Sequence, residues 1–257
     1  MGLDGKVKQK LIWPADGKEM ILVPAGEFIM GDDDAHWDDQ KPAHNVYVVA
    51  FYIDRYPVTN AEYKRFVDAT GHRAPRHILR GQVPLDRGDH PVTNLSWEDA
   101  RGYAHWTGKR LPTEAEWEKA ASWDPIKQIK TNYPWGDAWD ATRCNTVGEG
   151  GPGNTMPVGA HSPRGDSSYG VADMIGNVWE WCSSASAPYP YQPNNGCEDP
   201  LVESWRILRG AAWDTVLKRD ACCSFRHAFP CRFFLPSFGC RCVVSVSDAC
   251  GIVIGGE

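Results

Sequence analysis

The sequence lacks any long apolar run. None of its stretches approaches the roughly 18 apolar residues that predict a transmembrane helix. The first residues show no basic segment followed by an apolar one, so no signal peptide is predicted. The formal net charge of -6 argues against nucleic acid and against an anionic membrane as partners. These absences together predict a cytoplasmic protein.

Regularly paired cysteines are also missing. The chain has 9 cysteines, an odd number, and six of them follow residue 221. No two have the C-x-x-C spacing that a zinc knuckle or a thioredoxin-like motif needs. Because a disulfide framework would spread its pairs along the chain, we expect reduced thiols instead.

Large aromatic side chains and turn-forming residues are abundant. The 257 residues include 12 Trp, 25 Gly and 19 Pro, which predicts a loop-rich fold stabilised by large buried aromatics. We find no internal repeat and no linker that would divide the chain. The prediction is therefore an N-terminal extension over residues 1–18, followed by one domain over 19–257.

Three helices have recognisable starts. Capping boxes, in which a hydroxyl and an acidic side chain satisfy the first backbone N–H groups, are present at Thr59–Glu62, Ser96–Asp99 and Thr113–Glu116. Residues 20–30 predict two short strands around a Pro-Ala-Gly turn. Further strands are predicted over 46–56, 205–210 and 240–246. The mixture is typical of an α+β fold.

Residues 209–242, called segment 209–242 below, fit neither a core element nor an ordinary surface loop. Phenylalanines and cysteines alternate there with Arg, His, Pro and Asp, without an evident helical or strand period. Such a density of aromatics and thiols outside regular structure indicates a surface that contacts a ligand.

Four motifs resemble the formylglycine-generating enzyme, or sulfatase-modifying factor, family. They are HPVTNLSWEDARGYAHWTGKRLPTEAEWEKAA (90–121), YPWGD (133–137), DMIGNVWEW (173–181) and WRILRG (205–210). The resemblance implies a variant of the C-type lectin fold, with small twisted antiparallel sheets, few helices and much irregular chain.

The catalytic residues of that family do not transfer to this chain. The family uses two cysteines spaced C-x4-C shortly after an R-G-G-S-W/F motif, which reads Arg209-Gly-Ala-Ala-Trp213 here. The two positions fall on Thr215 and Asp220, and neither residue can supply a thiolate. The family's iron-dependent sulfoxide synthases need a histidine cluster on an added helical domain that this sequence lacks. The prediction is that the chain has no catalytic residues and is not an enzyme.

A second group on the same scaffold is the variable proteins of diversity-generating retroelements. Their randomised adenines give codons that end in a pyrimidine and cannot encode Lys, Glu, Gln, Met or Trp. Those five types occupy 44 positions of residues 1–218 and none of residues 219–250. This depletion favours a ligand-binding protein that displays a hypervariable surface.

Segment 209–242 then divides into a scaffold and a display set. The predicted scaffold positions are Arg209, Gly210, Trp213, Pro230, Arg232, Gly239 and Arg241. The predicted ligand-binding positions are Asp214, Thr215, Val216, Asp220, Ala221, Cys223, Ser224, His227, Ala228, Phe229, Cys231, Phe233, Phe234 and Leu235. The expected ligand is a protein or another macromolecule, because exposed aromatics mark binding surfaces. The alternative for Phe229, Phe233 and Phe234 is ordinary core packing.

The resemblance also implies a structural calcium site in DMIGNVWEW. Its ligands would be the side chains of Asp173 and Glu180 and the carbonyl groups of Gly176 and Val178, oxygen donors that suit Ca²⁺. The alternative is a structural turn in which Glu180 pairs with an arginine. Trp179 and Trp181 are expected in the core.

Two other functions stay open. One is a formylglycine-generating oxidase with displaced cysteines, and the other is a degenerate structural or accessory module in which residues 211–240 have drifted.

Overall fold

A computed structural model describes residues 9–78, 81–202 and 204–249. The strands are β1 (Lys10–Ile12), β2 (Glu19–Val23), β3 (Gly26–Met30), β4 (His44–Val48), β5 (Phe51–Asp54), β6 (Trp123–Asp124), β7 (Ile129–Lys130), β8 (Trp179–Ala185), β9 (Trp205–Arg209), β10 (Arg226–Pro230), β11 (Phe238–Gly239) and β12 (Val243–Ser245). The helices are α1 (Asn60–Thr70), α2 (Trp97–Trp106) and α3 (Glu114–Ser122), with 3-10 turns η1 (Asp38–Gln40), η2 (Ala141–Arg143), η3 (Val147–Glu149) and η4 (Lys218–Asp220).

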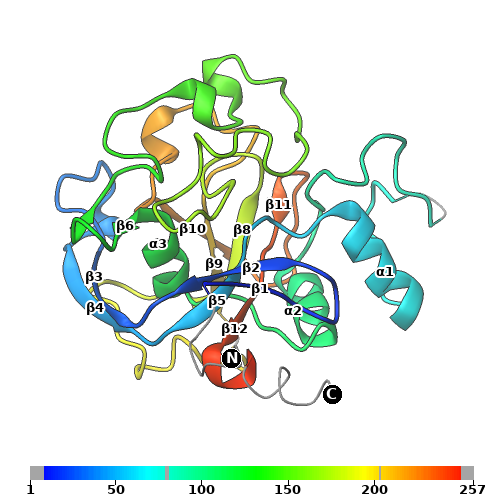
Figure 1. Ribbon diagram of the computed structural model, residues 1–257, viewed down its shortest axis with the longest axis horizontal. Helices are drawn as coiled ribbons and strands as arrows, with labels where there is room; N and C mark the ends of the chain where they lie inside the picture. Colours follow the sequence, from blue (N-terminus) through cyan, green and yellow to red (C-terminus); the bar gives the residue numbers. More distant parts are fainter. Residues whose placement is uncertain (1–8, 79–80, 203, 250–257) are drawn as a thin grey trace.

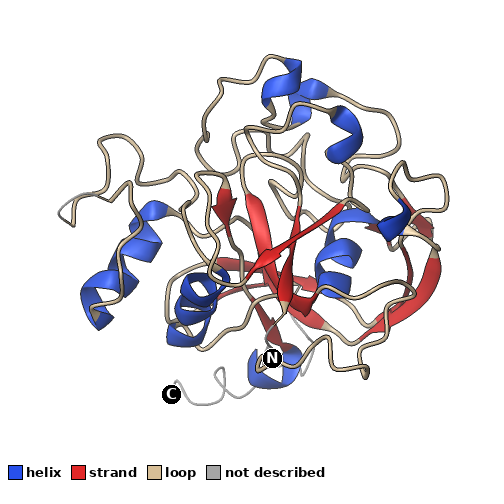
Figure 2. Ribbon diagram, turned by 180° about the vertical axis from the view of Figure 1, so that it is seen from behind, coloured by secondary structure: helices blue, strands red, loops and turns tan. Residues whose placement is uncertain are grey.

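Two small sheets organise the described chain. One has the order β1-β2-β5-β12 and the other β10-β9-β8-β11, and two-stranded pairs β3-β4 and β6-β7 accompany them. Every strand pair is antiparallel except β11 with β8. Long irregular connections surround the sheets (Figures 1 and 2). The predicted α+β class and lectin-like architecture are confirmed.

The three predicted helix starts are confirmed. At each N-cap, Thr59, Ser96 and Thr113, the hydroxyl accepts the N–H of the third helical residue and that residue's carboxylate reaches back to the cap. Gly71 ends α1 in the left-handed conformation, at φ 71°, where a glycine avoids the steric penalty of a Cβ.

The boundary after residue 18 is wrong. Strand β1 pairs with β2, and the Trp13 side chain is 2% exposed. Its indole N–H donates to the Thr107 carbonyl at 2.7 Å. The carboxylate of Asp16 accepts a hydrogen bond from the buried Lys109 ammonium at 2.8 Å. The domain therefore includes the chain from Lys10 onward, because these contacts bury an apolar ring and a charge pair together. Residues 1–8 lie outside the described part.

Two strand predictions also need correction. Residues 46–56 form two strands in different sheets, β4 and β5, because the chain leaves one sheet at residues 49–50. Segment 209–242 does contain a strand, β10, which forms the edge of its sheet beside β9. Phe225, His227 and Phe229 recur there at every second position, the strand period. The predicted strands around 20–30 and at 205–210 are confirmed.

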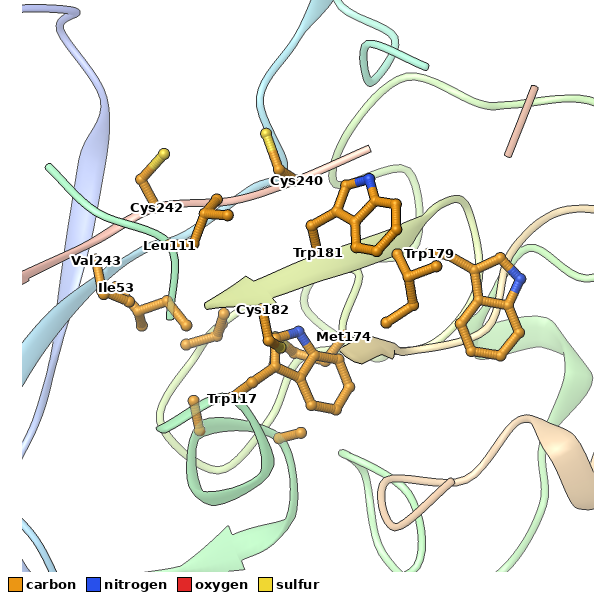
Figure 3. Packing of buried hydrophobic residues seen from close by; sticks show 14 of the residues in the cluster. Ile53, Leu111, Trp117, Met174, Trp179, Trp181, Cys182, Cys240, Cys242 and Val243 are labelled. Atoms are coloured by element: carbon orange, nitrogen blue, oxygen red, sulfur yellow. The ribbon is translucent and has the colours of Figure 1, made fainter. Parts of the chain in front are cut away.

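The core lies around β8 (Figure 3). Trp117 and Trp181 are fully buried, and Trp179 is 9% exposed. The indole N–H of Trp181 donates to the Leu95 carbonyl at 2.9 Å, so its burial leaves no polar atom unpaired. The buried thiols of Cys182, Cys240 and Cys242 lie within the same apolar cluster (Figure 3) and act there as small hydrophobic groups.

Candidate functional site

Arginine–glutamate pairs hold segment 209–242 to the core. Arg209 binds Glu118 of α3. Arg226 binds both carboxylate oxygens of Glu114, at 2.7 and 2.8 Å. All four side chains are nearly inaccessible to solvent. Burial alone would lower the pKa of Arg226, but the neighbouring Glu114 and Tyr189 have the larger, opposite effect. The net pKa is raised above its usual value, so the guanidinium stays charged.

A third pair joins the two sheets. Arg241 donates from Nε and Nη2 to the two oxygens of Glu180, each at 2.7 Å. The same guanidinium donates to the carbonyl groups of Asp54 at 3.1 Å and Ala172 at 2.8 Å. A planar fork can satisfy several acceptors at once. Arg241 therefore fixes the end of segment 209–242 against both β5 and β8.

A set of rings lies on and beside β10, and we call His227, Phe229 and Phe233 the aromatic surface. The Phe229 and Phe233 rings are stacked with centroids 5.1 Å apart, and His227 lies 4.7 Å from Phe229. Phe233 is 42% exposed and His227 is exposed. Trp179 and Phe225 support the aromatic surface from the core side, with the indole 6.0 Å from His227. The neighbouring rings remove part of the water around the imidazole, although the residue is exposed, and this desolvation lowers the pKa of His227.

The other predicted display positions do not all join this surface. Asp214 and Val216 are exposed, and Thr215 packs beside η3, where its carbonyl accepts the Gly148 N–H at 3.1 Å. Phe234 lies against the guanidinium groups of Arg73 and Arg76, about 5 Å from its centroid. Half-buried side chains are Thr215, Asp220, Ala228, Phe229, Cys231, Phe234 and Leu235.

Three predicted display positions are wrong. Ala221, Cys223 and Ser224 are at most 3% exposed. Cys223 and Ala221 belong to the hydrophobic core, and the Ser224 hydroxyl donates to Gln40 at 2.9 Å. They are buried because the chain turns inward after η4 before it enters β10.

Two predicted scaffold positions are also wrong, because Pro230 and Arg232 are exposed. Neither contributes to the interior that Arg209, Gly210, Gly239 and Arg241 occupy.

The two positions expected for catalytic cysteines carry other contacts. The Thr215 hydroxyl accepts the Ala212 N–H at 3.0 Å. An Asp220 oxygen accepts the Trp37 indole N–H at 3.2 Å. The nearby Cys222 is partly exposed, and burial raises the pKa of its thiol. A raised pKa reduces the fraction of reactive thiolate at neutral pH.

The proposed calcium ligands do not form a set of free oxygens. Both oxygens of Glu180 bind Arg241, and one also accepts the Trp117 indole N–H at 2.7 Å. The Gly176 carbonyl accepts the Val178 N–H at 2.9 Å. An Asp173 oxygen accepts the Gly159 N–H at 2.6 Å. Glu180 is therefore the anion of a buried ion pair, and the set does not fit a calcium ion.

The described residues hold no group of three or more His, Cys, Asp or Glu side chains placed to bind a metal. Among the same residues, no helix has the length and apolar content to cross a bilayer.

Sequence reasoning missed Trp179, Phe225 and Phe238 as supports of the aromatic surface. The Phe238 ring lies 5.1 Å from that of Phe229 and is buried, so it supports Phe229 from the interior. The alternation of Phe225, His227 and Phe229, which predicts one face of a strand, could have found Phe225. Trp179 and Phe238 are brought to this surface by β8 and β11, which no local pattern in segment 209–242 indicates.

Known proteins similar to this chain include named enzymes. It is 36% identical over 231 residues to the hercynine oxygenase of Mycolicibacterium smegmatis, covering 75% of this chain and 54% of that protein. It is 32% identical over 271 residues to the formylglycine-generating enzyme of Streptomyces coelicolor, covering 82% of each. The chain thus spans about half the length of the hercynine oxygenase. These relatives, named as enzymes and 32–36% identical to the chain, overturn the prediction that the chain is not an enzyme.

Among solved structures, Treponema denticola variable protein 1 superposes with a TM-score of 0.70 at 18% identity, covering 93% of this chain and 99% of that one. This likeness concerns the fold. Residues 9–246 match the sulfatase-modifying factor enzyme 1-like domain family. The order of motifs, the lectin-like sheets and this match lead to one conclusion: the chain belongs to the formylglycine-generating enzyme/sulfatase-modifying factor family.

Proposed function

We propose that this protein binds a macromolecular ligand, such as another protein, through the aromatic surface. We also propose that the residues at the exposed positions of segment 209–242 differ between variants of the gene. The observation that carries the proposal is the stack of Phe229 and Phe233 beside an exposed His227. Aromatic side chains offer a large contact area with little loss of conformational entropy, which suits a binding surface.

The buried arginine–glutamate pairs of segment 209–242 support such a role, since they fix the backbone that carries the aromatic surface. Arg226 lies between Phe225 and His227 in the sequence and is fixed to Glu114 on the buried side of β10. Substitutions of exposed residues leave these buried pairs intact. The absence of Lys, Glu, Gln, Met and Trp from residues 219–250 agrees with diversification at pyrimidine-ending codons.

A peptide selection tests the binding surface. Random peptides displayed on phage are selected on the immobilised protein, and their binding is measured to a double variant with His227→Ser and Phe233→Ser. We expect at least a tenfold loss of binding, because both changes remove exposed ring area. Ile126→Ser is the matched control, since Ile126 is 92% exposed and is not part of the aromatic surface. Peptides that bind the double variant as well as the original protein would contradict the proposal.

The neighbouring DNA tests the variability. A near-copy of the coding region for residues 209–242, differing mainly at adenines and lying near a reverse transcriptase gene, is the expected finding. A family of close homologues with invariant aromatic-surface residues would point instead to one inherited ligand.

A second candidate function is oxidation of a substrate thiol, favoured by the named enzymes among the relatives and by the partly exposed Cys222 beside the buried Cys223. A cysteine peptide with a sulfatase-type sequence is incubated in air with the copper-supplied protein, and aldehyde is detected with a hydrazide label. Aldehyde that disappears in Cys222→Ser would support this function. The Cys223 thiol is fully buried and Cys222 is only partly exposed, so a peptide has little access to either sulfur, and burial raises the pKa of both thiols. The binding function is therefore the better supported one.

A further inference from the structure

One buried arginine differs from the others in its partners. Four arginines in the described chain are buried: Arg206, Arg209, Arg226 and Arg241. The last three each bind a glutamate. Arg206 is 1% exposed and has no carboxylate within ion-pair distance among the described residues. Its Nη atoms donate to the carbonyl groups of Ser183, Asp199 and Val202. Its Nε is buried with no hydrogen-bond partner, as is the Nε of Arg209, so the missing carboxylate is what distinguishes Arg206.

Arg206 lies in the wall of a pocket of about 510 Å³. That volume is within the roughly 300–1,000 Å³ that small-molecule sites usually have. A second guanidinium, Arg101, also lines the pocket and forms no ion pair in the described chain. Both cations lie over the Trp97 ring, with Arg206 4.4 Å and Arg101 5.5 Å from its centroid. Among the described residues that line the pocket, Arg101 and Arg206 are therefore two guanidinium groups that form no ion pair with a carboxylate.

The remaining walls are largely apolar. Pro200, Leu201, Val202 and Trp205 line the pocket beside the two cations. Leu201 is 81% exposed and Trp205 is 57% exposed, a large apolar area to leave in water. At the rim, Arg232 and Glu98 approach to 3.5 Å, and both are mostly exposed, so their pair contributes little to the charge balance inside.

A buried cation without a counterion is costly, because burial removes water and backbone carbonyl groups return only part of the lost solvation. In agreement with that, burial lowers the pKa of Arg206. An anion that enters the pocket would offset this cost through the field of Arg206. It would also accept a two-pronged hydrogen bond from Arg101, whose guanidinium is exposed.

We propose that this pocket binds a small organic carboxylate with an aromatic or branched apolar body. The carboxylate meets Arg101 above Trp97, and the apolar body covers Leu201 and Trp205. This inference does not rest on the proposed function, because Trp97, Arg101 and Arg206 lie outside segment 209–242, although Pro230, Cys231 and Arg232 of that segment also line the pocket.

The experiment compares two probes of the same shape, 2-naphthoate and the neutral 2-naphthamide, by isothermal titration calorimetry at low salt. We expect naphthoate to bind at least tenfold more tightly than the amide. Arg101→Gln should lower the affinity for naphthoate at least fivefold and leave that for the amide unchanged, because only the acid uses the charge. Circular dichroism checks that the variant is folded.

Arg219→Gln is the matched control, since Arg219 also lies over an indole ring, that of Trp37, but outside the pocket. Equal affinities for acid and amide, an equal loss in Arg219→Gln, or no naphthoate binding at millimolar concentration would each overturn the proposal.

Glu203 lies outside the described residues, between two that line the pocket, so Glu203→Gln is measured as well. Naphthoate binding that occurs only in this variant would mean that the chain supplies its own counterion, and it would also overturn the proposal. We expect the double variant His227→Ser and Phe233→Ser to bind naphthoate as the original protein does. The pocket and the aromatic surface can therefore be tested separately, and failure of one proposal does not imply failure of the other.

Discussion

Segment 209–242 contains two sets of residues, buried arginines and exposed aromatic rings, which differ in the number of specific partners they need. Its buried arginines each bind a fixed glutamate and several carbonyl groups. The aromatic surface, a few residues away, contacts mainly other rings and solvent. A buried guanidinium needs a counterion or several hydrogen-bond acceptors at fixed positions, whereas an exposed ring needs only a neighbour of similar size. The same stretch of sequence can therefore keep a scaffold constant and change the residues that contact a ligand.

The largest test of this difference uses two arginines that lie nine positions apart. Arg241→Ala should lower the free energy of unfolding by about 3–5 kcal/mol, because it leaves the Glu180 carboxylate buried without its cation. Urea denaturation at pH 7 measures this loss. The side chain of Arg241 has 0% exposure.

Arg232→Ala is the control for that measurement. Its side chain is 84% exposed and its ion pair with Glu98 is at the surface, so we expect a change within about 0.5 kcal/mol. Similar losses of unfolding free energy in the two variants would mean that segment 209–242 does not divide into a buried frame, formed by Arg209, Arg226 and Arg241 with their glutamates, and an exposed surface that tolerates substitution.

Glycine substitutions sharpen the comparison at the start of the segment. Gly210 has φ 95°, and a Cβ there would lie 2.9 Å from both the Met174 carbonyl oxygen and the Trp117 ring. Gly210→Ala should cost about 3 kcal/mol, the sum of backbone strain and overpacking in the core. Gly170→Ala is the matched control, since Gly170 has φ 88° with nothing within 4 Å of its Cβ.

We expect Gly170→Ala to cost about 1 kcal/mol, which represents the strain alone. Thermal unfolding of both variants measures the difference. Equal melting temperatures would show that the core yields to the added methyl group at Gly210, and the frame would then be less rigid than the packing indicates.

Local chemistry in the sequence predicted much of the fold. Each capping box and the Pro-Ala-Gly turn depends on residues within a few positions of one another, so Thr59, Ser96 and Thr113 could be identified as helix starts directly. The aromatic content of segment 209–242 likewise pointed to its exposed rings. The burial of Trp13 could not be predicted, because its partner Thr107 is remote in sequence.

The predictions that failed depended on long-range contacts. Glu180 was expected either to bind calcium or to pair with an arginine, and only the fold shows which arginine it is, because it places Arg241 against both oxygens. Ala221, Cys223 and Ser224 were expected at the surface, because sequence position alone does not show where an irregular chain turns inward. Arg101 lies one helical turn after Trp97 on α2, but only the fold brings Arg206 of β9 against the same ring.

The smallest predicted effect compares two neighbouring carboxyl groups of the frame. Glu180 has Arg241 as its partner, whereas no cation binds the Asp173 carboxyl group within the described residues, and burial raises the pKa of Asp173 from 3.8 to about 6. Since the folded-state pKa is the higher one, the folded protein holds this proton more tightly than the unfolded chain does. The stabilisation is complete below about pH 4 and is lost as the pH rises through 6.

Asp173→Asn should therefore be about 1–2 kcal/mol more stable than the original protein at pH 7 and equally stable near pH 4, because the amide keeps the acceptor for Gly159 without a charge. Urea midpoints at pH 4, 5, 6 and 7 measure the difference between the two proteins, in which the titration of all other groups cancels. A variant that is less stable at pH 7, together with a melting temperature of the original protein that falls on chelation, would contradict this account. That result would mean that a bound cation neutralises Asp173, and the frame would then include a metal that its described ion pairs do not require.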